Sequence, residues 1–175
     1  MDLIARQAGV SRSTLYRRFP TRADLIAGAF EARMVEYADA VNTALAEPDP
    51  WLGFRGFVER VCAMQAEDRG FANVLTMCFP AARGFEAQRD RAYQGLVELI
   101  DRAKAAGALR ADFSPEDLVL LLMANAGVVA ATADAVPEVW RRFVAYQLQA
   151  FSAANTEPLP PPPTPTAMYR ALMRP

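Results

Sequence analysis

Apolar and polar residues alternate with a helical period along almost the whole chain. Apolar side chains recur three and four positions apart, and Gly, Pro and small polar clusters interrupt the pattern. These breaks predict helices over residues 2–8, 11–19, 22–46, 51–67, 71–79, 84–106, 115–135 and 138–153. Six prolines in residues 158–165 predict a polyproline II stretch, and residues 166–175 are expected to be loose. The pattern therefore predicts an all-α protein.

Several helix ends carry explicit signals. Ser11 suits an N-cap, and Thr21 with Asp24 forms a capping-box pattern. Ser114 followed by Pro115 and two acidic residues is the strongest start signal in the chain. These signals divide the chain into an N-terminal unit with its connecting helix (1–46), a helical body (47–155) and a Pro-rich tail (156–175).

The first 30 residues have the spacing of a helix-turn-helix. A short helix, a tight turn centred on Gly9 and a second helix follow one another, and Leu15 and Phe19 are expected to face inward. The other face of the second helix and the junction after it hold side chains that donate to bases or phosphates. The candidate DNA-binding residues are Ser11, Arg12, Ser13, Thr14, Tyr16, Arg17, Arg18, Thr21 and Arg22.

Charge is distributed unevenly. The chain has a net charge of −1, but residues 1–22 carry five arginines and one acidic residue, Asp2. A small basic head on an acidic body indicates local contact with phosphates. Periodicity and charge alone leave a second interpretation open, namely a solvated, arginine-bearing helix pair in an ordinary helical protein.

The segment IARQAGVSRSTLYRRFPTRADLI (residues 4–26) closely resembles the helix-turn-helix of the TetR family of bacterial one-component repressors. The matching positions are Ile4, Ala5, Ala8, Gly9, Val10, Ser11, Thr14, Leu15, Tyr16, Phe19, Thr21, Arg22 and Leu25. Arg18 stands where the family usually has histidine, and it keeps the capacity to donate to phosphate.

The resemblance implies a homodimer that reads a palindromic operator and is released by a small-molecule effector. It also implies a three-helix DNA-binding domain, whose first helix would precede residue 1. We expect a head without that helix to be loosely packed and to bind DNA weakly, either because the sequence starts at an internal methionine or because it is a shortened form.

A group of large apolar residues is expected to line an effector pocket between the helices of the body, with Asn125 as a polar anchor. The candidate pocket residues are Phe54, Phe57, Met64, Phe71, Leu75, Met77, Phe79, Tyr93 and Asn125. An apolar or aromatic effector would suit this lining. For each residue taken singly, ordinary core packing is the alternative.

The last two predicted helices of the body are so apolar that one subunit cannot cover them, which predicts a dimer. The candidate interface residues are Leu118, Leu121, Leu122, Val128, Val129, Trp140, Phe143, Val144, Gln147, Leu148 and Phe151. The alternative is that they form the core of a single chain.

Enzymatic and metal-binding roles are disfavoured. The chain has no histidine, and its two cysteines, Cys62 and Cys78, have no metal-ligand spacing. We expect no cofactor and no metal, free thiols in a reducing cytoplasm, and a buried rather than membrane-spanning apolar stretch over residues 118–133. The predicted function is a ligand-responsive transcription regulator, and the alternative is a small-molecule-binding dimer that has lost operator binding.

Overall fold

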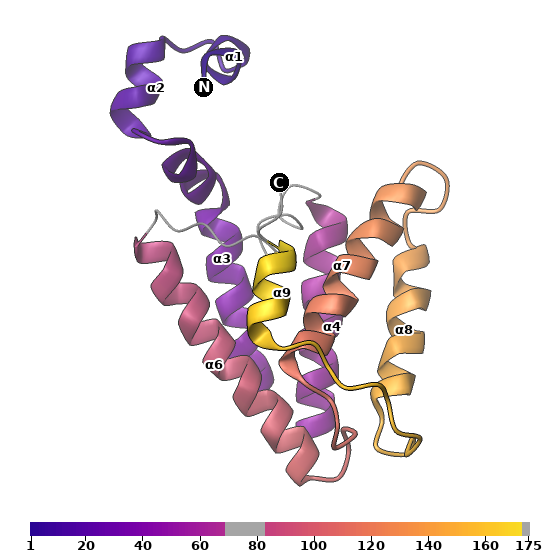
Figure 1. Ribbon diagram of the computed structural model, residues 1–175. Helices are drawn as coiled ribbons and strands as arrows, with labels where there is room; N and C mark the ends of the chain where they lie inside the picture. The colour runs from indigo at the N-terminus through magenta and orange to yellow at the C-terminus, as the bar shows by residue number, and fades with distance from the viewer. Residues whose placement is uncertain (69–82, 173–175) are drawn as a thin grey trace.

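The computed structural model describes residues 1–68 and 83–172, and every regular element in these ranges is a helix. The helices are α1 (Asp2–Gln7), α2 (Arg12–Arg18), α3 (Arg22–Ala46), α4 (Pro50–Glu67), α6 (Arg83–Ala105), α7 (Pro115–Thr132), α8 (Val139–Phe151) and α9 (Pro165–Leu172). Figure 1 shows α1 and α2 as a separate head, joined by α3 to a body made of the other helices. The helix expected over residues 71–79 lies outside the described residues.

The capping signals fix the helix starts where the sequence predicts them. Thr21 accepts a hydrogen bond from the amide of Asp24, whose carboxylate accepts one from the amide of Thr21 (3.1 and 2.9 Å). Ser114 and Asp117 form the second capping box, with Pro115 as the first residue of α7. Asp49 accepts from the amides of two residues in the first turn of α4, at 2.8 and 3.1 Å. Each cap satisfies amide groups that have no partner within the helix.

The core of the body lies where α3 packs on α4 and α6, and where α7 packs on α4 and α8. The crossing of α3 and α6 is close: a Cβ placed on Gly95 would lie 2.3 Å from Cγ1 of Val41. No side chain fits there unless Val41 or the helices shift. The glycine therefore sets how tightly the connecting helix α3 is held to the body.

Helix α7 alone, among the described helices, is long and apolar enough to cross a membrane by length and composition. In this structure, however, its buried face includes Leu118, Leu122 and the amide of Asn125 and lies against α4 and α8. One face of α7 therefore packs in the core of the chain, although only 33% of this stretch is buried.

The tail differs from expectation. Residues 165–172 form α9, because Pro165 suits the first position of a helix and Thr164 accepts a hydrogen bond from the amide of Ala167 at 3.2 Å. Met168 is buried, so α9 packs against the rest of the molecule. The prediction of a loose tail is wrong for these residues.

Candidate functional site

The head has the geometry of a helix-turn-helix. Gly9 takes a φ of +66° between α1 and α2, a conformation that costs glycine little. Ser11 then caps α2 by accepting a hydrogen bond from the amide of Thr14 at 3.1 Å. Ala5 and Leu15 are buried, so the two short helices meet on one apolar face.

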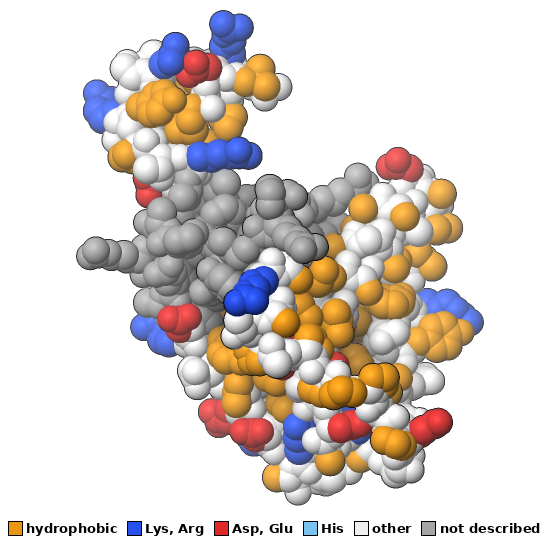
Figure 2. Space-filling view, viewed as in Figure 1, with side chains coloured by type: hydrophobic (Ala, Val, Ile, Leu, Met, Phe, Trp, Pro, Cys, Tyr) orange, Lys and Arg blue, Asp and Glu red, His pale blue; other side chains and the backbone are white. Residues whose placement is uncertain are grey.

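The opposite face of the head is available to a ligand. All nine candidate DNA-binding residues are exposed, and they lie on α2, at its N-cap and at the start of α3. Figure 2 shows basic side chains projecting from several sides of the head. The geometry thus presents guanidinium and hydroxyl donors from α2 and the start of α3, at a distance from the acidic body.

Asp2 modifies this donor set in a way that sequence reasoning missed. Its carboxylate lies 2.9 Å from Nε of Arg12, and both side chains remain more than half exposed. Asp2 precedes Arg12 by ten residues, so only the turn at Gly9 brings them together. A guanine or phosphate contact by Arg12 must compete with this carboxylate.

The apolar side of the head is partly open. Val10, which follows the turn at Gly9, is 41% exposed and does not fill the angle between α1 and α2. Leu3 and Ile4 are also exposed. Phe19 packs on α3 instead, where its ring lies against Gly28 so closely that an added Cβ would be 2.6 Å away. This contact joins the end of α2 to the connecting helix.

The candidate pocket residues do not all line one cavity. Phe54, Phe57, Met64 and Asn125 are buried, whereas Tyr93 is 45% exposed and so faces away from the core. Phe71, Leu75, Met77 and Phe79 lie outside the described residues.

Two of the buried rings make ordinary core contacts. Phe57 packs edge-on against Tyr37 at 5.7 Å between ring centroids, and Phe54 packs against Phe113 at 5.4 Å. Their contacts agree with core packing, the alternative that the sequence left open.

A buried amide pair between α4 and α7 is the most unusual polar feature of the body. Asn125 donates from Nδ2 to Oε1 of Gln65 (2.9 Å) and to the carbonyl of Cys62 (3.3 Å), and Gln65 donates to the carbonyl of Leu122 (3.2 Å). Both partners of Nδ2 are acceptors only, so the amide orientation is fixed. Oδ1 of Asn125 is the one buried side-chain oxygen or nitrogen without a partner in the described part of the chain. A donor from a bound molecule would satisfy it.

A groove of about 930 Å³ runs between α3 and α6. Apolar residues such as Val35 form part of its wall, but Asp39, Glu98 and Asp101 also line it. It therefore differs from the apolar pocket expected from the sequence.

The predicted dimer interface residues are largely taken up inside one chain. Leu118, Leu121, Leu122, Val129, Trp140, Val144 and Leu148 are buried, and Val128, Phe143, Gln147 and Phe151 are partly buried. The first group packs between α7, α8 and the body and cannot also face a partner. The large exposed apolar residues of these helices are Leu120 and Met123 on α7 and Tyr146 on α8, and Val136 lies in the connection between the two helices. The small Gly127 on α7 is exposed as well.

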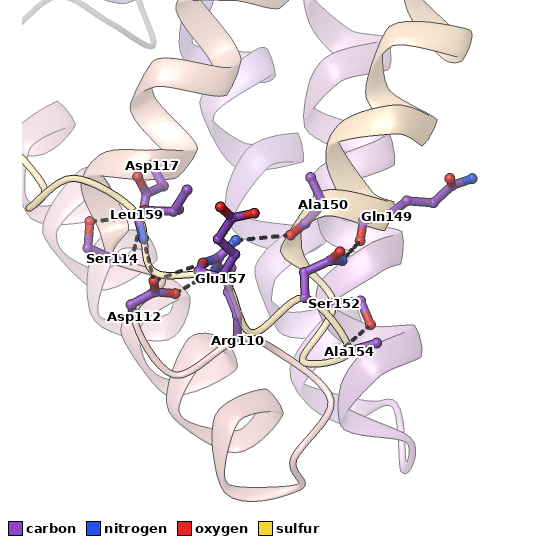
Figure 3. A network of polar contacts seen from close by, with 11 residues as sticks. Arg110, Asp112, Ser114, Asp117, Gln149, Ala150, Ser152, Ala154, Glu157 and Leu159 are labelled. Carbon is purple, nitrogen blue, oxygen red and sulfur yellow. Dashed lines mark hydrogen bonds and ion pairs between the residues drawn. The ribbon is translucent and has the colours of Figure 1, made fainter.

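Arg110 fixes the end of α8 and the start of the tail. Its guanidinium donates to Asp112 (2.9 Å), to the carbonyl of Glu157 (2.7 Å) and to the carbonyl of Ala150 (3.4 Å), as Figure 3 shows. Leu109 and Ser152 pair as an isolated antiparallel bridge beside it. No sequence pattern predicted this network, because the carbonyls of Ala150 and Glu157 lie 40 and 47 residues from Arg110 along the chain.

Comparisons with known proteins give matches to transcription regulators for both the head and the body. Residues 1–29 match the family described as bacterial regulatory proteins, tetR family, and residues 49–149 match the C-terminal domain of SbtR-like transcriptional regulators. The crystal structure of the TetR transcriptional regulator SCO0520 from Streptomyces coelicolor is similar, with a TM-score of 0.53 and 29% identity over 85% of each chain. A search of curated protein sequences gave no significant match.

Proposed function

Because the chain belongs to the TetR family of bacterial transcription regulators, we propose that it is a repressor that binds a palindromic operator as a homodimer and is released by a small apolar effector. The exposed donor face of α2 carries this proposal. In a helix-turn-helix the N-terminal residues of the second helix enter the major groove. Here these residues are Arg12, Ser13 and Thr14, all exposed.

The positions of the arginines on α2 and α3 suggest which of them contact bases and which contact phosphates. Arg12 lies at the groove end of α2 and suits a bidentate contact to guanine. Arg18 and Arg22 lie at the far end of α2 and at the start of α3, where the flanking backbone would run. Phosphate contacts by these two would position the head without reading sequence.

Dimerisation is supported by the outer faces of α7 and α8. Leu120, Met123 and Tyr146 are between 44% and 55% exposed, and a second copy would remove them from water. Two heads held by such an interface would contact half-sites about one helical turn, roughly 34–36 Å, apart.

The effector is proposed to be mainly apolar and to carry one hydrogen-bond donor for Oδ1 of Asn125. The apolar side chains of Val61, Cys62 and Met64 are buried in the same part of α4 as the amide pair. Leaving a buried carbonyl oxygen without a donor costs about 1–3 kcal/mol. A donor-bearing effector would recover part of this free energy. The protein would act on DNA in the cytoplasm.

The test is binding to a duplex selected from random DNA and to a scrambled duplex of equal length, measured by fluorescence anisotropy at several salt concentrations. We expect the selected duplex to bind at least about 10³ times more tightly. Equal binding of both duplexes would leave only a non-specific DNA contact. No binding to either, together with binding of a small molecule, would favour the alternative of a sensor that has lost its operator.

A further inference from the structure

A cluster of charged side chains joins α3 to α4. Arg33 and Glu36 on α3 meet Arg60 and Glu67 on α4. Nη1 of Arg33 lies 2.8 Å from Glu36 and 3.0 Å from Glu67, and Nη1 of Arg60 lies 3.0 Å from Glu67. Arg60 also contacts Glu36, and Asp68 lies 4.0 Å from Arg33 at the edge of the cluster.

The connections in this cluster cross between the helices. Arg33 of α3 bonds to Glu67 of α4, while Arg60 of α4 bonds to Glu36 of α3. Hydrogen bonds from Arg60 and then Arg33 lower the pKa of Glu67, so it stays ionised near neutral pH. Each arginine therefore bridges two carboxylates, and the four groups form a closed ring of alternating charge.

The ring lies at the level where the body begins to hold α3. Met34 is the first fully buried residue among those of α3 whose side chains the structure describes, and Tyr37 and Val41 continue the buried stripe. Among the described side chains between Arg22 and Arg33, none is fully buried. Beyond the ring, α3 extends to the head (Figure 1). A small change in the tilt of α3 at this level produces a larger displacement of α1 and α2, because the head lies at the far end of α3.

The same part of α4 is also tied to α7. Gln65, two residues before Glu67, forms the buried amide pair with Asn125. A shift of α7 relative to α4 therefore acts on the final turns of α4, which carry Glu67. The amide pair and the ring are linked through a single helical turn.

We propose that the Arg33–Glu36–Arg60–Glu67 ring is the joint that sets the angle of α3 on α4, and that effector binding changes operator affinity by rearranging it. This inference rests on the proposed function. The four side chains are 29–47% exposed, and partly exposed ion pairs are individually weak. A joint made of such pairs can change partners without unfolding the apolar core beneath it, as a two-state element requires.

The test compares Arg60→Gln and Glu67→Gln with a matched control, Arg55→Gln. Arg55 pairs with Glu59 at 2.9 Å within α4 alone, so its loss removes an ion pair of the same kind without touching α3. A spin label at Gln7→Cys, in a Cys78→Ser background, reports the distance between the two heads of a dimer by double electron–electron resonance. Affinity for a selected operator is measured on the same variants.

We expect both ring variants to broaden the inter-head distance distribution and to weaken operator binding about three- to tenfold, while Arg55→Gln stays within twofold of the parent. Circular dichroism and thermal midpoints identify any variant that fails to fold, and Glu36→Gln, which removes the other carboxylate of the ring, then replaces it. Ring variants that match Arg55→Gln in both measurements overturn the joint. A parent protein without an inter-head distance or an operator overturns the proposed function, and the joint with it.

Discussion

Arg12 is already engaged by Asp2 in the free head, at 2.9 Å. The contact is exposed, and exposed ion pairs contribute at most about 1 kcal/mol. Asp2 nonetheless competes with DNA for the guanidinium of Arg12, because the two side chains are in direct contact. It is also the only acidic residue among the first 22. Asp2→Asn should therefore tighten operator binding, by up to about fivefold. Asp101→Asn on the exposed surface of α6 is the control, and anisotropy titrations that show no gain for Asp2→Asn would contradict this competition.

Arg12 and Arg22 should behave differently when replaced. Arg12→Ala is expected to cost about 1–3 kcal/mol of operator affinity and to relax the preference at one base pair, since it would read guanine. Arg22→Ala is expected to weaken binding to all DNA sequences alike. It should also reduce the slope of log affinity against log salt concentration by about one unit. The measurement is affinity for a set of single-base operator variants at several salt concentrations. Equal behaviour of the two variants would refute the division between base and phosphate contacts.

The buried amide pair should behave as a unit. Gln65→Leu and Asn125→Leu each leave the other amide without its 2.9 Å partner, so each should destabilise the fold by about 1–3 kcal/mol. The double variant should cost less than the sum of the single variants, by about 0.5–3 kcal/mol. Urea denaturation of the four proteins measures this coupling. Strict additivity would show that the two amides are not coupled.

At the scale of the element, the spacing of α3 and α6 depends on the absence of a side chain at Gly95. Gly95→Ala places its Cβ against Val41, which is itself buried, so the variant should lose about 1–3 kcal/mol of stability. Gly56→Ala is the matched control, because nothing lies within 4 Å of a Cβ there. The control should gain up to about 1 kcal/mol from helix propensity. Denaturant titrations that rank the two variants the other way would contradict the close crossing.

Helix positions were predictable from sequence wherever a local signal fixed an end. Thr21 with Asp24, and Ser114 with Asp117, cap their helices as expected, and Gly9 takes a positive φ at the predicted turn. The helix α9 was not predicted, because the six prolines in residues 158–165 indicated an extended tail. Thr164 and Pro165 nevertheless supply a helix start signal.

The faces of α7 and the contacts of the head were harder to predict. Helix α7 is apolar on nearly all sides, so its sequence shows that it is apolar throughout but not which side meets its own body. Leu118 and Leu121 consequently appeared suited to a partner, whereas Leu120 and Met123 are the exposed ones. The Asp2–Arg12 pair and the Arg110 network join residues that the fold alone brings together. Their distances depend on tertiary structure, which periodicity does not encode.

At the scale of the whole molecule, dimerisation should depend on the exposed apolar residues of α7 and α8. Met123→Glu and Tyr146→Glu would each bury a charge in the proposed interface, which is costly without a partner. We expect light scattering to give a dimer for the parent and a shift toward monomer for both variants. Leu159→Glu, an exposed apolar residue in the tail, is the control and should stay dimeric. Monomeric parent protein at micromolar concentration would contradict the interface.

The central claim is that two heads on one dimer read DNA through α2. Selection from a random duplex pool, followed by sequencing of the bound fraction, tests it most directly. The account predicts an enriched inverted repeat, with half-site centres about one helical turn apart, and loss of the enrichment when Arg12, Ser13 and Thr14 are all replaced by alanine. A pool that stays random, or a motif without two-fold symmetry that survives this replacement, would contradict it.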